Sequence, residues 1–166
     1  MGVPETLVSL RKHRWARLAL LPLNLSIPAE VEIGSEFRLL HYGMGTVIYP
    51  EVTIGDRVRI YQQVTVGRKD AHLPRAQSRF EWLTIGDDVV LFPGCKVLGG
   101  AGVTTIGRGT LVGANAVLMN STGENEIWAG NPARLVGHRK DLARPATGTD
   151  TDIDTEAAAS WARANV

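Results

Sequence analysis

Two histidines lie where the sequence pattern of this chain is interrupted, and imidazole is the side chain best suited to proton transfer near neutral pH. His41 belongs to the segment LLHYGMGT, residues 39–46, whose two glycines widen the choice of backbone conformations. His72 belongs to the longer polar segment GRKDAHLPRAQSRFEWLT, residues 67–84. Residue type alone leaves two interpretations open for each: a general base in a functional loop, or an ordinary surface histidine.

Both segments interrupt a strict six-residue repeat that must position them. Across residues 47–67 a bulky aliphatic residue returns at every sixth position, and a valine follows each of the first three by four positions: Ile48, Ile54, Ile60 and Val66, with Val52, Val58 and Val64. A period of six fits neither an amphipathic helix nor an alternating strand. It indicates stacked units that bury a shared interior only together. The pattern extends over residues 27–136, and loops are expected where its phase breaks.

These hexads, of the form IxxxVx with Gly or Pro at their corners, resemble those of the hexapeptide-repeat acyltransferases. The runs VIYPEVTIGDRVRIYQQVTVG, IGDDVVLFPGCKVLGG and AGNPARLVG are similar to the serine acetyltransferase branch of that family. The resemblance implies an all-β fold, a left-handed parallel β-helix in which three hexads form one triangular coil. It also implies an O-acetyltransferase that uses acetyl-CoA as co-substrate, acts on a small-molecule hydroxyl and forms a homotrimer with its active sites between neighbouring subunits.

The same resemblance implies that His41 is catalytic. In serine acetyltransferases the histidine of the corresponding loop takes the proton of the acceptor hydroxyl while that oxygen attacks the acetyl thioester directly. Two matched positions depart from the family. Ser26 stands where a carboxylate orients the histidine, and Leu40 where an aspartate contacts serine. Without these two carboxylates, the acceptor remains open between serine and a sugar or another hydroxyl compound.

Acceptor contacts are expected in the long insertion after Val66, because long loops without a repeat of their own are commonly functional. The family places an Arg-His pair in this region, and His72 is the expected substrate-binding residue here. Lys69 and Arg75 are its possible companions.

Coenzyme contacts follow from the resemblance in the same way. In the family the pantetheine arm of acetyl-CoA lies in a groove between coils of neighbouring subunits. The backbone positions that it touches correspond here to Gly67, Pro93 and Ala114. Arg134, in the AGNPAR ending, is expected to bind a phosphate of the coenzyme, since a guanidinium pairs well with phosphate.

The ends of the chain lack the repeat, which divides the sequence into residues 1–26, 27–140 and 141–166. Residues 1–26 predict one amphipathic helix with an apolar face and an opposite basic face: Leu7, Leu10, Trp15, Leu18 and Leu21, against Arg11, Lys12, His13, Arg14 and Arg17. This helix either caps the open end of the β-helix or rests on an anionic membrane surface through residues 7–21. Residues 141–166 predict a flexible acidic tail with a possible short helix.

Composition limits the binding partners, the role of the cysteine and the cellular compartment that the sequence predicts. A net charge of +1 without a basic and aromatic stripe gives no reason to expect nucleic acid. A lone cysteine, Cys95, falls on the inward series and is expected to pack in the core. The absence of a long apolar run or a signal peptide pattern predicts a cytoplasmic protein.

Two other functions suit the same fold. A γ-type carbonic anhydrase needs three histidines converging on a metal, whereas the four histidines here are scattered, so no metal is expected. A non-catalytic interaction scaffold is the other alternative, because the carboxylate that orients the base in the family is missing.

Overall fold

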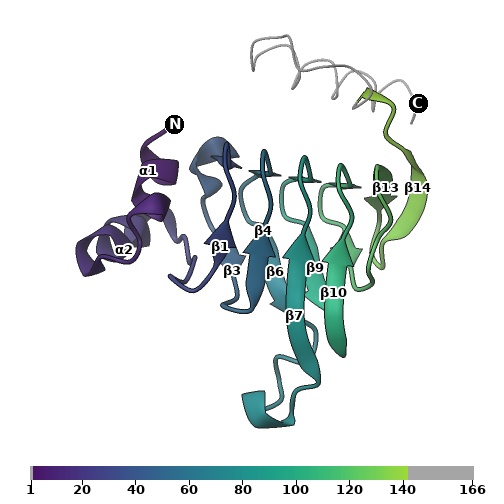
Figure 1. Cartoon of the computed structure of the whole chain (residues 1–166), viewed down its shortest axis with the longest axis horizontal. Helices are drawn as coiled ribbons and strands as arrows, with labels where there is room; N and C mark the ends of the chain where they lie inside the picture. Colours follow the sequence, from purple (N-terminus) through teal and green to yellow (C-terminus); the bar gives the residue numbers. More distant parts are fainter. Residues whose placement is uncertain (1, 142–166) are drawn as a thin grey trace.

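The computed structural model describes residues 2–141, apart from the side chains of Arg14 and Arg17, and its short strands form three sheets (Figure 1). The predicted tail lies outside the described residues beyond Asp141. No helix within residues 2–141 is long and apolar enough to cross a membrane. The predicted predominance of strands over helices is confirmed.

The first sheet contains β1 (Glu32–Ile33), β4 (Val52–Ile54), β7 (Phe80–Ile85) and β10 (Gly102–Ile106). The second contains β2 (Arg38–Leu39), β5 (Arg59–Ile60), β8 (Val90–Leu91), β11 (Leu111–Val112), β13 (Glu126–Ala129) and β14 (Arg134–His138). The third contains β3 (Val47–Ile48), β6 (Thr65–Arg68), β9 (Lys96–Gly99) and β12 (Val117–Leu118).

The chain visits the three sheets in rotation, from β1 to β12 without exception. Three successive strands therefore make one turn, and each strand pairs in parallel with a strand of the next turn. Ile48 pairs with Val66, three hexads later, which is the pairing that a six-residue period requires. Among the strands of residues 2–141, only the pair β13 and β14 is antiparallel, and there the chain folds back after the last turn.

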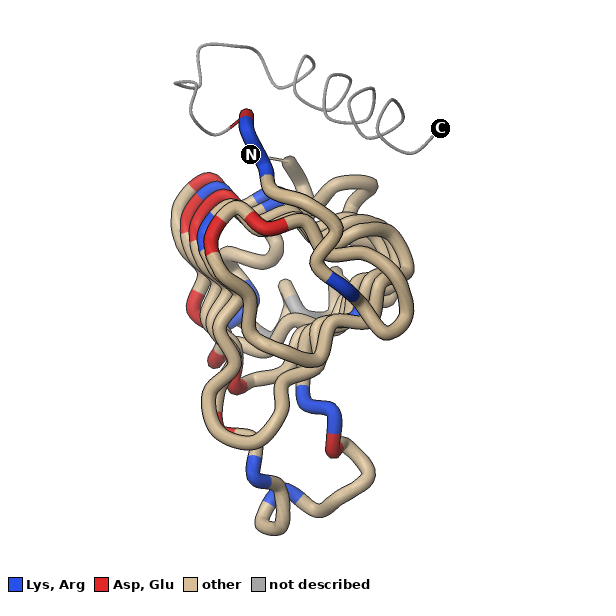
Figure 2. Tube along the Cα trace, turned by 90° about the vertical axis from the view of Figure 1, so that its right-hand side faces the viewer, with Lys and Arg blue, Asp and Glu red and all other residues tan. Residues whose placement is uncertain are grey.

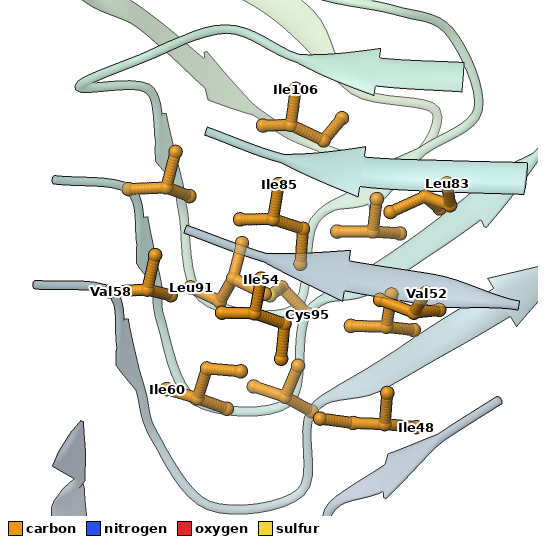
Figure 3. Packing of buried hydrophobic residues seen from close by; sticks show 14 of the residues in the cluster. Ile48, Val52, Ile54, Val58, Ile60, Leu83, Ile85, Leu91, Cys95 and Ile106 are labelled. Atoms are coloured by element: carbon orange, nitrogen blue, oxygen red, sulfur yellow. The ribbon is translucent and has the colours of Figure 1, made fainter. Parts of the chain in front are cut away.

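The interior of the stack is filled by the aliphatic residues of the two hexad series (Figure 3). Ile54, Ile85 and Ile106 lie one above another, each at most 2% exposed. Cys95 is completely buried among them, and this burial raises the pKa of its thiol to about 12. The expectation that Cys95 is a core residue is confirmed.

Charged residues stack at the corner between the first and second sheets (Figure 2). Arg57 donates two hydrogen bonds to the carboxylate of Asp88 one turn along, at 2.8 and 3.0 Å, and Arg108 donates a third at 3.3 Å. These guanidinium groups, Arg57 above all, hold the pKa of Asp88 below its usual range. A Cβ on Gly55 would lie against the carboxylate of Asp87 and 2.9 Å from its backbone nitrogen, so a side chain there would require the next turn to shift.

The N-terminal segment differs from the single helix predicted for residues 1–26. Two helices, α1 (Val3–Ser9) and α2 (Arg14–Leu20), are separated by a turn and followed by a 3-10 turn, η1 (Leu21–Leu23). Because residues 10–13 break the helix, the expected apolar stripe does not continue from α1 to α2 on one face. Trp15, Leu18 and Leu21, which were expected to pack together, are 56%, 65% and 66% exposed.

Arg11 shows why the expected basic face does not form as predicted. It is 8% exposed, and its guanidinium donates hydrogen bonds to the carbonyl oxygens of Val8 at 2.7 Å, Pro28 at 2.9 Å and Val31. Burial lowers the pKa of Arg11. The two helices therefore lie at the open end of the stack and are fastened to the first turn by a buried arginine (Figure 1).

Candidate active site

His41 lies at the corner between the second and third sheets, in the 3-10 segment η2 (Leu40–Gly43). His41 and Tyr42 both have left-handed backbones, with φ of 51° and 60°, which is unfavourable for residues with a side chain. Gly43 completes the turn at φ 61°, where a Cβ would lie 2.7 Å from the side chain of Leu39. Single left-handed residues also occupy other corners, such as Arg57, Gln63 and Asp88, but within residues 2–141 two successive non-glycine residues adopt this conformation only at His41 and Tyr42. The turn leaves the His41 side chain exposed at the corner.

Aromatic rings continue this corner along the stack. The rings of His41 and Tyr61 are 5.9 Å apart and tilted by 44°, and those of Tyr61 and Phe92 are stacked 5.3 Å apart. Tyr61 and Phe92 directly follow β5 and β8, so they occupy equivalent places on successive turns. The imidazole thus stands at one end of an apolar wall, a surface suited to hold a ligand beside a base.

Ser26 and Leu40, the two residues that depart from the family pattern, can be located relative to His41. Ser26 forms an isolated parallel bridge with Val47, immediately after the His41 loop, and it is exposed. Leu40 is half-buried beside His41. Within residues 2–141 the His41 ring makes no hydrogen bond, so neither Ser26 nor Leu40 orients it in that way, and its ring contact is with Tyr61.

A carboxylate does contact the segment that leads into the His41 loop, by a hydrogen bond to the backbone of that segment. Glu5, on α1, is 7% exposed, and its Oε1 accepts a hydrogen bond of 2.8 Å from the backbone N–H of Leu39. Its Oε2 is buried and has no partner among the described residues. The sequence analysis missed this residue, because a glutamate in the first turn of a helix is common and carries no signal of a distant partner.

His72 lies in the arm that leaves the stack between β6 and β7 (Figure 1). Arg68 ties this arm together by donating to the carbonyl oxygens of Asp70 and Leu73 at 3.1 and 2.8 Å. Arg75 is in the 3-10 segment η3 (Arg75–Gln77) and donates to Glu51 at 2.8 Å. His72 itself is exposed.

The structure does not bring His41 and His72 to one place within a chain. The His41 loop enters the third sheet at the start of β3, whereas the arm with His72 leaves that sheet at the end of β6. The two histidines therefore lie beyond opposite ends of the strands of the third sheet, His41 before the starts and His72 after the ends.

The four expected coenzyme residues divide in the same way. Pro93 and Ala114 lie on the His41 corner, where the N–H of Asn115 donates to the carbonyl of Pro93 at 2.9 Å. Gly67 is on β6, toward the end of the strand that leads into the His72 arm, and it is buried beneath the ring of Tyr49. Arg134 is exposed on β14, at the far end of the stack. Nothing in residues 2–141 gathers three His, Cys, Asp or Glu side chains as metal ligands.

Comparison with known proteins identifies this arrangement. The chain is 39% identical over 128 residues to the plasmid serine acetyltransferase of Synechococcus elongatus, an alignment covering 66% of this chain and 38% of that protein. It is 32% identical over 137 residues to the serine acetyltransferase of Staphylococcus xylosus, covering 81% of this chain and 60% of the relative. The chain belongs to the hexapeptide-repeat acyltransferases, on their serine acetyltransferase branch. It thus spans between 38% and 60% of the length of these relatives.

Solved structures of serine acetyltransferases share the fold of this family member. The serine acetyltransferase of Brucella abortus strain S19 in complex with coenzyme A matches with a TM-score of 0.64 and 22% identity, over 82% of this chain and 53% of that one. That of Vibrio cholerae matches with a TM-score of 0.65 and 24% identity, over 88% and 57%. No family model matches the chain.

Proposed function

We propose that this chain is an acetyl-CoA-dependent O-acetyltransferase that uses His41 as its general base. The observation that carries the proposal is the exposed His41 on a strained turn, beside Tyr61 and on the corner that also holds Pro93 and Ala114. The relatives named serine acetyltransferase, and the coenzyme A bound to one structural neighbour, support the same reaction.

In the proposed reaction the acceptor hydroxyl attacks the carbonyl carbon of the acetyl thioester while His41 takes the hydroxyl proton. The new C–O bond forms, the C–S bond breaks, and the thiolate of CoA leaves and is protonated. An unassisted alcohol is a weak nucleophile, which is why a positioned base is needed. A thiolate leaves readily, so no enzyme nucleophile is required. Cys95 is not available for that role, because it is buried and its thiol has a pKa of about 12.

We also propose that the turns form a left-handed parallel β-helix. The regular rotation of strands through three sheets supports a helical stack, and the likeness to solved serine acetyltransferases supports the hand. The spacing of the hexads contains no information on handedness.

The proposed active site lies between two subunits of a homotrimer. His41, Pro93 and Ala114 would come from the corner between the second and third sheets of one subunit. Gly67 and the His72 arm would come from the other end of the third-sheet strands in its neighbour. The outer face of the third sheet suits such a contact, because most of its large side chains are apolar: Val47, Tyr49, Leu98, Val117 and Met119. Lys96, the one charge among the outward residues of β3, β9 and β12, already donates to the carbonyls of Gln63 and Gly94.

The experiment is an acceptor screen. Purified protein is incubated with acetyl-CoA and a panel of hydroxyl compounds, serine and sugars included, and free CoA is measured. His41→Ala is run beside His13→Ala, which removes an exposed histidine from the cap. We expect one acceptor class to release CoA, with loss only in His41→Ala. Release from no acceptor would favour the scaffold alternative, and equal release by both variants would remove His41 from the mechanism.

A further inference from the structure

An apolar surface with basic surroundings covers the outer side of the N-terminal helices. Trp15, Leu18 and Leu21 recur at intervals of three along α2 and into η1, and each is more than half exposed. We call these three residues the cap face. Large side chains that are exposed in a row, while Ala16 and Leu20 on the same helix are buried, need a partner outside the described chain.

Charge narrows the choice of partner. Residues 6–29 contain no Asp or Glu, while Lys12, Arg14 and Arg17 lie in or beside α2. Arg11 is not part of this charge, because it is buried against the first turn of the stack. A second copy of the cap face would bring like charges together, which disfavours self-association through it. An anionic surface would be attracted instead.

The residue types fit a bilayer better than a protein groove. Tryptophan prefers the boundary between lipid headgroups and acyl chains, where its ring is apolar and its N–H stays hydrated. Leucines beside it would enter the acyl region, while the exposed Lys12 would reach anionic headgroups. Leu21 also borders a hollow of about 310 Å³ whose other walls include Leu25, Ile27 and Pro28, together with Ser26 and the carboxylate-bearing Glu30.

We infer that the cap face binds the surface of an anionic lipid bilayer, with Trp15, Leu18 and Leu21 inserted at the headgroup boundary. The helices that carry these residues lie at the end of the stack, beyond β1, so a flat partner can approach this end without meeting the strands (Figure 1). The inference does not depend on the proposed acetyl transfer.

Vesicle cosedimentation of the full chain tests the inference. Vesicles of phosphatidylcholine alone are compared with vesicles that also contain phosphatidylserine, at low and high salt. The test variant is Leu18→Glu with Leu21→Glu, and the matched control is Val103→Glu, an equally accessible apolar residue on β10 that is 56% exposed. Lys12→Glu is compared in the same way with Lys140→Glu. Thermal unfolding shows that each variant is folded, and sedimentation velocity reports its size without lipid.

We expect binding to the anionic vesicles only, weakened by salt and reduced about tenfold or more in the double variant but not in Val103→Glu. Lys12→Glu should weaken binding and Lys140→Glu should not. Absence of binding to anionic vesicles, or equal binding by the double variant, overturns the inference. A smaller particle for the double variant in the absence of lipid also overturns it, because the cap face would then be a contact between copies.

Discussion

The imidazole of His41 combines exposure, a strained backbone and an aromatic neighbour, and these features argue for proton transfer. Positioned proton transfer contributes about 10² to 10⁴ in rate. His41→Ala should therefore lower kcat with the true acceptor by that order, while binding of acetyl-CoA, measured by calorimetry, is retained. A kcat near that of the unaltered protein would direct the search for a base to residues 67–84.

His72 should act on the acceptor alone if it has a role. It is exposed on the arm after β6 and has no place beside His41 within one chain. His72→Ala should raise the KM of the acceptor and leave kcat and the KM of acetyl-CoA close to their original values. Steady-state kinetics with both substrates varied make this comparison, and a fall in kcat alone would contradict the assignment.

Cys95 should be replaceable without loss of turnover. Its side chain is fully buried and its thiol stays protonated at neutral pH. Cys95→Ala should cost about 1 kcal/mol of stability, since it removes one buried atom, and the native thiol should resist alkylation at pH about 7. Denaturant titration and mass spectrometry after iodoacetamide treatment make these measurements. Loss of turnover with unchanged stability would reveal a nucleophile.

The sequence predicted the roles of His41, His72 and Cys95 in different amounts of detail. Cys95 followed from the hexad register, because a period of six assigns each position to the interior or the surface. His41 followed from the break in that register, but its left-handed backbone and its contact with Tyr61 did not. Those features depend on how turns stack, which brings together residues that are twenty positions apart in the sequence.

Among the elements, α1 controls the loop that carries His41. Glu5 accepts a hydrogen bond from the N–H of Leu39 at 2.8 Å, at the residue immediately before η2. Glu5→Ala would leave that buried N–H without a partner, at a cost of about 1 to 3 kcal/mol. We expect a lower Tm and a fall in kcat with little change in the KM of acetyl-CoA. Glu5→Gln keeps an acceptor oxygen and should preserve most of both, whereas equal loss in the two variants would contradict a role in positioning the loop.

The charged corner should make stability depend on acid pH. Arg57 and Arg108 lower the pKa of Asp88 in the folded state. A carboxyl with a lowered pKa stabilises the fold above its ordinary pKa, and that stabilisation is lost as the pH falls through the folded value. The Tm should therefore fall between pH about 5 and about 2, and Asp88→Asn should have a lower Tm at neutral pH with a shallower acid decline. Glu124→Gln, an exposed acid near the same corner, should follow the unaltered protein.

The elements at the two ends were harder to predict than the stack. The hexads specify strands because every turn repeats the same contacts. Residues 1–26 have no such repetition, and their apolar spacing fitted one helix as well as two. The buried Arg11 decides the outcome, because its guanidinium binds carbonyl groups at Pro28 and Val31 that only the folded first turn brings near.

At the scale of the whole molecule, the outer face of the third sheet should hold three subunits together. Met119→Glu, which places a charge at a residue 37% exposed on that face, should dissociate the trimer and abolish turnover while the unfolding transition is kept. Val103→Glu on the first sheet is the matched control. Sedimentation equilibrium makes the measurement, and a stable monomer of the unaltered protein at micromolar concentration would contradict both the trimer and the shared site.

The two charged side chains of the cap also limit the length of the stack. A parallel stack can in principle grow without end, because its last strand offers the same free N–H and C=O groups as every strand inside it. Glu5 and Arg11 occupy such groups at Leu39, Pro28 and Val31. Their side chains occupy the backbone groups that another turn would need for pairing, but they do not themselves offer a strand to which a further turn could bind. A molecule deprived of them would present a template at one end, on which the chain of another molecule could add as the next layer of a fibre.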